Sequence, residues 1–206
     1  MKIALMGPQG CGKGTIGEML SEKLNIPLVS MGQILRDVPK THPRYTELQK
    51  IMAEGDLVPQ ELASQFLRER VNQPDCANGY ILDGWMRKMI DLHYFDPQPD
   101  KVVLLNISRQ TSLERLTNRR TCLQCGAVFN VKTVPPKQEG ICDICGGKLE
   151  QREDDKPEAI NNRLDIYYSD TQEVLNHFRD LGKLVEVDAE PEPKVVFESV
   201  LSALNL

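Results

Sequence analysis

The chain lacks a long hydrophobic run, an excess of positive charge and any repeated or low-complexity segment. No apolar stretch approaches the roughly 20 residues that a bilayer-spanning helix needs, so we expect no membrane association. The short apolar start at residues 3–6 runs into glycines rather than into the small residues of a signal-peptide cleavage site, and we interpret it as a strand. The expected compartment is then the reducing cytoplasm, in which disulfides are disfavoured.

Basic residues and histidine are also limited. The 25 Lys and Arg residues are outnumbered by 30 Asp and Glu, which leaves a formal net charge of −5. Proteins that wrap nucleic acid usually have a basic domain or face, so we expect no nucleic-acid partner. His42, His93 and His177 lie far apart, without the spacing of a shared site. The 206 residues are enough for one full domain with a buried core and a small insertion.

Strand-like and helix-like segments alternate along most of the chain. Apolar runs bounded by turn residues predict buried strands at residues 3–6, 80–83, 102–106 and 183–187. Amphipathic stretches predict helices at residues 13–24, 60–71, 111–119, 157–181 and 193–204. This alternation is typical of an α/β fold with a doubly wound parallel sheet. A helical stretch near residues 30–71 and a cysteine-rich stretch at residues 121–152 interrupt it, and we expect both to leave the sheet.

A glycine-rich turn joins the first expected strand to the first expected helix. The turn reads Gly7-Pro8-Gln9-Gly10-Cys11-Gly12-Lys13-Gly14-Thr15, which has the spacing of a phosphate-binding loop except that Gly14 follows the lysine. Glycines let consecutive backbone N–H groups turn inward at a helix N-terminus and form an anion site. We therefore expect Lys13 to reach the β- and γ-phosphates of a nucleotide. A strand-to-helix turn without a ligand is the alternative.

Four cysteines form two close pairs. Cys122 and Cys125 make one pair, and Cys142 and Cys145 make the other. In a reducing compartment this spacing indicates a tetrahedral, structural Zn²⁺ site more than it indicates two disulfides. The surrounding segment is too short to bury a core, so the metal would supply its folding energy.

Several segments resemble one family in order as well as in sequence. The Gly-Lys-Gly-Thr form of the loop is followed by Val29-Ser30-Met31-Gly32-Gln33-Ile34-Leu35-Arg36, by Gly55-Asp56-Leu57-Val58, and by Tyr80-Ile81-Leu82-Asp83-Gly84-Trp85-Met86-Arg87. Together with the arginines and carboxylates at positions 115, 119, 152, 154, 155 and 163, these segments resemble the adenylate kinases over essentially the whole chain. Zinc-bearing members of that family carry the four-cysteine pattern in a lid.

The resemblance implies an α/β P-loop core, a helical insertion that binds a nucleoside monophosphate (NMP), and a small zinc-binding lid. The expected core comprises residues 1–29, 60–120 and 153–206, the NMP-binding region residues 30–59, and the lid residues 121–152. The implied partners are ATP and a nucleoside monophosphate, with Mg²⁺ accompanying ATP and Zn²⁺ in the lid. No feature of the sequence demands a dimer, so we expect a monomer.

The resemblance also implies the site residues. On the ATP side they are Gly10, Cys11, Gly12, Lys13, Gly14, Thr15, Arg115, Arg119, Val128, Phe129 and Ala189. On the NMP side they are Met31, Arg36, Asp56, Leu57, Val58, Gly84, Trp85, Met86, Arg87, Asp91, Arg152 and Arg163. Phosphoryl transfer has a loose transition state, so positioning and positive charge matter more than a general base. The expected catalytic residues are Lys13, Arg87, Arg119, Arg152, Arg163 and Asp83, of which Asp83 would hold Mg²⁺ through water.

The chain departs from the family where the acceptor would bind. Met86 stands where the family usually has Pro, Gln33 stands for a carboxylate, Met31 for Thr, and Asp91 for the Gln that reads adenine. An ionised Asp can only accept hydrogen bonds, and its two oxygens suit the N1–H and 2-amino donors of guanine. AMP remains the expected acceptor. The alternatives are a changed preference for GMP or a pyrimidine monophosphate, or an Asp91 that turns to solvent.

Two rival functions differ in class. A non-enzymatic nucleotide- or nucleic-acid-binding zinc-ribbon protein is one, but the lysines near the cysteines are offset by acidic residues (Lys132, Lys137 and Lys148 against Glu139, Asp143 and Glu150). A kinase for another small molecule is the other, and Arg36 and Arg87 on the monophosphate side argue against it.

Overall fold

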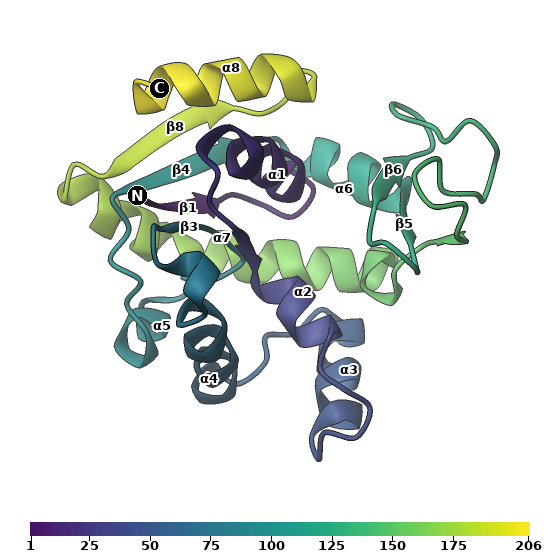
Figure 1. Cartoon of the computed structure of the whole chain (residues 1–206), viewed down its shortest axis with the longest axis horizontal. Coiled ribbons are helices and arrows are strands. Elements are labelled where there is room, and N and C mark those ends of the chain that lie inside the picture. Colours follow the sequence, from purple (N-terminus) through teal and green to yellow (C-terminus); the bar gives the residue numbers. More distant parts are fainter.

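Five parallel strands form the centre of the structure, a computed structural model that describes residues 1–206 (Figure 1). The strands are β1 (Lys2–Met6), β2 (Leu28–Ser30), β3 (Tyr80–Asp83), β4 (Lys101–Asn106) and β8 (Leu184–Asp188). Their order across the sheet is β2-β3-β1-β4-β8, and every neighbouring pair is parallel. The carboxyl ends of all five strands therefore meet at one edge, where open α/β sheets bind their ligands.

Helices cover both faces of this sheet. The main ones are α1 (Lys13–Leu24), α7 (Pro157–Asp180) and α8 (Pro193–Leu204). Successive strand residues point to opposite faces, so Leu5 packs with α1 and α8 while Ala4 belongs to the cluster that contains α7. Figure 1 shows α8 and α7 on opposite sides of the sheet. The predicted doubly wound α/β architecture is thus confirmed.

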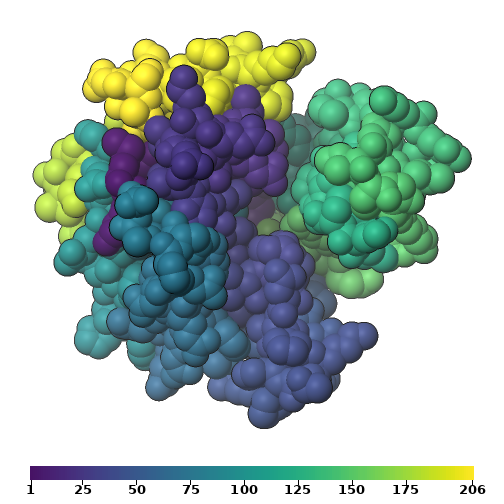
Figure 2. Space-filling model, in the orientation of Figure 1, coloured from purple at the N-terminus to yellow at the C-terminus, as the bar shows by residue number.

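Two excursions leave the sheet. The first contains α2 (Met31–Arg36), α3 (Tyr45–Glu54) and α4 (Gln60–Val71), with the short helices η1 (Pro74–Cys76) and α5 (Met89–Tyr94) nearby in sequence. The second follows α6 (Arg109–Thr117) and contains the antiparallel sheet β6-β5-β7, made of β5 (Arg119–Cys122), β6 (Val128–Asn130) and β7 (Leu149–Glu150). It returns through η2 (Glu153–Asp155) and stands off from the rest as a separate lobe (Figure 2).

The predicted strands and helices are present, with three corrections. Strand β2 was not expected, because three residues are too few to show a period. Helix α5 was not expected either, and its six residues are likewise short for a helical pattern. The helix predicted to reach residue 119 ends at Thr117, because Arg119 already begins β5. No helix has both the length and the apolar character needed to cross a membrane.

Candidate active site

The glycine-rich turn lies between the end of β1 and the start of α1, at the carboxyl edge of the sheet. Gly7 has a φ of +139°, and a Cβ there would lie 2.3 Å from the backbone oxygen of Leu105, so only glycine fits. Lys13 Nζ donates to the carbonyl oxygens of Gly7 at 2.8 Å and Pro8 at 3.0 Å. The ammonium group is therefore held over the loop, beside the N-terminus of α1, where anions bind.

Asp83 ends the strand next to the loop. Its backbone is in register with Leu5 of β1 and with Ser30 of β2, and Ser30 Oγ donates to Asp83 Oδ2 at 3.4 Å. The predicted metal-side carboxylate thus lies at the same sheet edge as the phosphate loop. Gln9 Oε1, inside the loop, is buried and accepts no hydrogen bond.

A pocket of about 700 Å³, counted with its open mouth, lies beside this edge. It is enclosed by α2, the turn after α3, the loop after β3 and the start of α7. Its walls include every predicted NMP-side residue except Met86 and Arg152, namely Met31, Arg36, Asp56, Leu57, Val58, Gly84, Trp85, Arg87, Asp91 and Arg163. The pocket therefore combines apolar walls with three arginines, which suits a flat base attached to an anionic group.

Helix α7 holds the turn that closes one side of this pocket. Asn162 Nδ2 donates to the backbone oxygen of Glu54 at 3.3 Å and to Asp56 Oδ1 at 2.6 Å. Gly55 has a φ of +80°, and a Cβ there would lie 2.6 Å from the carbonyl oxygen of Ala159. Glycine thus lets the turn contact α7 directly, one helical turn before Arg163.

Carboxylates fix two of the predicted arginines. Asp155, whose side chain is fully buried, accepts from Arg119 Nε at 2.7 Å and Nη2 at 2.5 Å. Asp154 accepts from Arg163 Nη1 at 2.7 Å. Arg152 has no such partner, and its Nε donates to Thr121 Oγ1 at 2.9 Å. The two-pronged Arg119–Asp155 contact fixes the plane of that guanidinium as well as its place.

The arginines also act on one another electrostatically. Burial lowers the pKa values of Arg36, Arg87, Arg152 and Arg163. Neighbouring Arg119 lowers the pKa of Arg36, Arg152 and Arg163 further. These positive charges are poorly solvated and only partly balanced, so a polyanion bound among them would be strongly favoured.

Asp91 is buried, with 4% of its surface exposed, so the alternative in which it turns to solvent is wrong. Its Oδ2 accepts from the backbone N–H groups of Arg87 at 2.7 Å and Lys88 at 3.0 Å. Only Oδ1 therefore remains for a bound base, and the argument that both oxygens face guanine is also wrong. Burial raises the pKa of this carboxyl group.

Met86 has a φ of +59° and is almost completely buried. A proline ring holds φ near −65°, so this backbone conformation excludes the proline that the resemblance leads one to expect. The loop after β3 passes through this left-handed residue, and Trp85 Nε1 donates to the carbonyl oxygen of Phe95 at 2.9 Å.

The remaining ATP-side residues lie in two places. Arg115 Nη1 donates to the carbonyl oxygen of Ala189 at 3.0 Å, which joins two predicted residues that are 74 positions apart. Val128 and Phe129 lie on β6, where Val128 is exposed and Phe129 is buried in the small core of the lobe. Phe129 therefore also supports the lobe itself.

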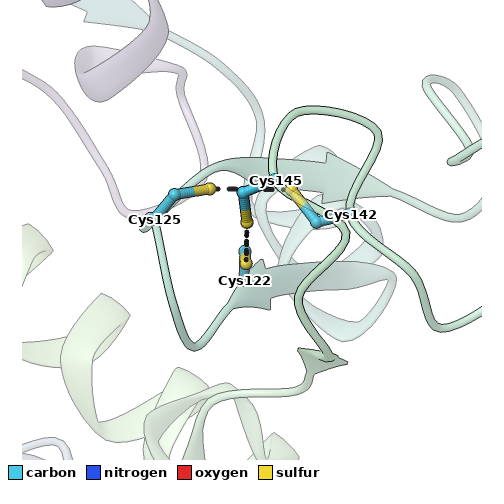
Figure 3. A group of neighbouring side chains, drawn as sticks. All are labelled: Cys122, Cys125, Cys142 and Cys145. Atoms are coloured by element: carbon cyan, nitrogen blue, oxygen red, sulfur yellow. Dashed lines mark hydrogen bonds between the residues drawn. The ribbon is translucent and has the colours of Figure 1, made fainter.

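The four paired cysteines converge within this lobe (Figure 3). All four sulfur atoms lie within 4.8 Å of one another, with Cys122 Sγ 3.4 Å from Cys145 Sγ and Cys125 Sγ 3.6 Å from Cys142 Sγ. A tetrahedron with Zn–S bonds of 2.3 Å has S···S edges of about 3.8 Å, so the thiols have the arrangement of a structural zinc site.

Sequence reasoning missed two residues that support the pocket. Asn162 and Thr171 lie on α7, and each donates to backbone more than 80 positions away in the sequence. The only signal for Thr171 in the sequence is that a threonine stands among the apolar positions of a long amphipathic helix. Nothing in the neighbouring sequence indicates its partner.

Comparisons with known proteins agree with this geometry. Residues 5–183 match a family model described as "Adenylate kinase". The chain is 37% identical to an adenylate kinase of Clostridium tetani, over 100% of this chain and 99% of that protein. It is 38% identical to one of Carboxydothermus hydrogenoformans and 39% identical to one of Caldicellulosiruptor saccharolyticus, in both cases over the full length of each chain.

Proposed function

Because this chain belongs to the adenylate kinase family and is therefore a nucleoside monophosphate kinase, we propose that it transfers the γ-phosphoryl group of ATP, bound with Mg²⁺, to AMP, giving two ADP. One observation carries the proposal: a pocket containing Arg36, Arg87 and Arg163 opens beside the strand edge that also bears the phosphate loop. Two phosphate-bearing molecules bound there would meet end to end.

The residues of this chain would act mainly by positioning and by charge. Backbone N–H groups of the loop and Lys13 would bind the β- and γ-phosphates, while the arginines would neutralise charge that spreads over the equatorial oxygens in the transition state. The acceptor oxygen is already ionised, so no side chain needs to remove a proton. Residues 121–152 would close over ATP as a lid and exclude the water that would otherwise take the phosphoryl group. Residues 30–59 would bind the acceptor, and the rest would form the core.

The two proposed metals have matching donors. A carboxylate at Asp83 and the unpartnered amide oxygen of Gln9 are the hard oxygen ligands or water acceptors that Mg²⁺ prefers, and the ion would neutralise phosphate charge. Four thiolates of Cys122, Cys125, Cys142 and Cys145 fill a tetrahedral shell completely, so Zn²⁺ there would be structural.

The first test is Lys13→Met, compared with Lys23→Met at the exposed end of the same helix. We expect kcat for ADP formation to fall by about 10³-fold in the first variant, in line with the loss of one cationic arm at a transferring phosphoryl group. The control should stay within about twofold of the parent. Unchanged kcat in Lys13→Met would contradict the proposed site.

A panel of AMP, GMP, CMP and UMP as acceptors tests the specificity. The one free oxygen of Asp91 can accept from the 6-amino group of AMP. The other bases also offer a donor, so the preference for AMP rests on the family to which the chain belongs. We expect AMP to have a kcat/KM at least about tenfold above the others. A higher value for GMP would instead support the altered preference.

A further inference from the structure

Thr171 is a buried polar residue for which the mechanism above has no use. Only 3% of its surface is exposed, and it lies in the second half of α7. It is one of five buried polar or charged residues in the chain, and two others, Asp91 and Asp155, belong to the site.

The hydrogen bond of Thr171 differs from the usual one for a hydroxyl inside a helix. Such a hydroxyl normally donates to the carbonyl of the preceding turn. Thr117 does so to Leu113, at 2.8 Å, and Ser199 does so to Val195, at 3.0 Å. Thr171 Oγ1 instead donates to the backbone oxygen of Arg87 at 3.0 Å, across 84 positions of sequence.

The backbone of Arg87 is thus held on both sides. Its N–H donates to Asp91 Oδ2 at 2.7 Å, and its C=O accepts from Thr171. The residue before it, Met86, has a left-handed backbone that is costly for a side chain of this size, so these contacts also oppose relaxation of the loop. The guanidinium folds back over Gly84, where an added Cβ would lie 3.5 Å from Nη2.

Helix α7 also carries two further acceptor-side contacts. Arg163 lies eight positions before Thr171, about 12 Å along the helix axis. One position before Arg163, Asn162 holds the turn at Asp56. A single rigid helix thereby supports three parts of the acceptor pocket.

We propose that Thr171 is a positioning residue for phosphoryl transfer: its hydroxyl fixes the peptide of Arg87 on α7, so that the Arg87 and Arg163 guanidinium groups meet one acceptor phosphate at a set spacing. The inference rests on the proposed function, in which Arg87 binds that phosphate. Thr171→Val keeps the shape and branching of the side chain but removes the donor. Thr171→Ser keeps the donor.

Thr171→Val should change the kinetic constants for AMP but not those for ATP. For Thr171→Val, kcat/KM for AMP should fall by about tenfold, because small displacements of a binding arginine are costly, while KM for ATP stays within about twofold. Thr171→Ser should recover most of the loss. Asp170→Asn is the matched control, because it removes the charge of the neighbouring, partly exposed ion pair with Lys88, while the amide oxygen can still accept from Ser169, and it should leave both constants unchanged. Thr171→Ala replaces the valine variant if the latter does not fold.

Calorimetric binding of AMP to the parent, Thr171→Val, Arg87→Ala and the double variant completes the test. A positioning role predicts that Thr171→Val weakens binding about tenfold in the parent and less than about twofold when Arg87 is already Ala. An equal loss in both backgrounds, or no loss in the parent while Arg87→Ala weakens AMP binding, would overturn the role of Thr171 alone. Parent-like binding by Arg87→Ala would instead overturn the proposed function of Arg87.

Discussion

At the scale of single residues, the site depends on charged groups whose partners decide their behaviour. Asp155 and Arg119 form a buried pair, with 0% and 17% of their side chains exposed, whereas Arg179 and Glu186 form a pair in which both are 46% exposed. Water solvates Arg179 and Glu186 whether or not they pair. Water has little access to Arg119 and Asp155, so the loss of one partner leaves the other as a poorly solvated charge.

Asp155→Asn should therefore lower the free energy of unfolding by about 3 kcal/mol, the usual cost of leaving one member of a buried pair uncompensated. Glu186→Gln is the matched change in the exposed pair and should cost less than about 1 kcal/mol. Urea unfolding followed by circular dichroism measures both. Equal costs would show that Arg119 gains no stability from its partner.

Asp91→Asn should show a pH-dependent effect on stability. Burial raises the pKa of Asp91 above its ordinary 3.8, so this carboxyl contributes most to stability below that pH and loses the contribution as pH rises through the raised value. Asn does not titrate, and its carbonyl can still accept from Arg87 and Lys88. The stability of the variant relative to the parent should therefore rise as the pH increases from about 4 through the raised pKa of Asp91. Urea unfolding at a series of pH values measures the free energy of unfolding of both proteins. A difference between variant and parent that stays constant with pH would contradict the prediction.

Met86→Pro should destabilise the loop after β3. Met86 has a φ of +59°, which the proline ring cannot adopt, so the loop must change path around Arg87. We expect a loss of about 2 kcal/mol or more in unfolding free energy and weaker AMP binding. Met86→Leu keeps the volume and should cost less than about 1.5 kcal/mol. A fully stable proline variant would show that the loop accepts both conformations.

At the scale of elements, the central sheet and the proposed lid (residues 121–152) are stabilised in different ways. The sheet lies between apolar clusters of 20 and 15 buried residues, whereas the lid strands share a cluster of only four, two of which are cysteines. So small a cluster cannot offset the conformational entropy of ordering this segment. Metal binding, which is worth about 10 kcal/mol or more in small zinc modules, can do so.

Cys122→Ser should therefore release the metal and unfold the lid locally. We expect zinc content to fall from about one per chain to a small fraction, and new protease cleavage to appear between residues 121 and 152 while the sheet stays folded. Cys76→Ser is the matched control, because Cys76 is buried elsewhere and should leave zinc content unchanged. Full zinc occupancy in Cys122→Ser would contradict a four-thiolate site.

At the scale of the whole molecule, the proposed lid leaves the core after α6 and returns to it through η2. Cys122 and Leu149 are cross-strand partners, so an Asn-Gly turn can replace residues 123–148 and close a hairpin. Neither large cluster contains a lid residue, and the thermal midpoint of the core should shift by less than about 5 °C.

The same shortened protein should still bind AMP but transfer phosphate at least about 100-fold more slowly. Residues 123–148 would no longer close over ATP beside Arg119 and Arg152 and exclude water. Calorimetry and a coupled ADP assay measure the two properties. A shortened chain that fails to fold would show that the lid belongs to the core, and full transfer activity would exclude the lid from catalysis.

Features that depend on short-range spacing could be predicted from the amino-acid sequence alone. The phosphate loop, the paired cysteines and the strand-helix alternation can each be recognised within a few dozen residues, because local backbone geometry and side-chain period produce them. The pairing of groups that are distant in the sequence depends instead on the folded chain. One oxygen of Asp91 accepts from backbone N–H groups, and Arg119 donates to Asp155. Thr171 donates to the carbonyl oxygen of Arg87. These contacts form only when α5, α7 and residues 119–155 pack together, so no local pattern in the sequence reveals them. Burial, which also depends on that packing, determines which charged groups are left without a partner.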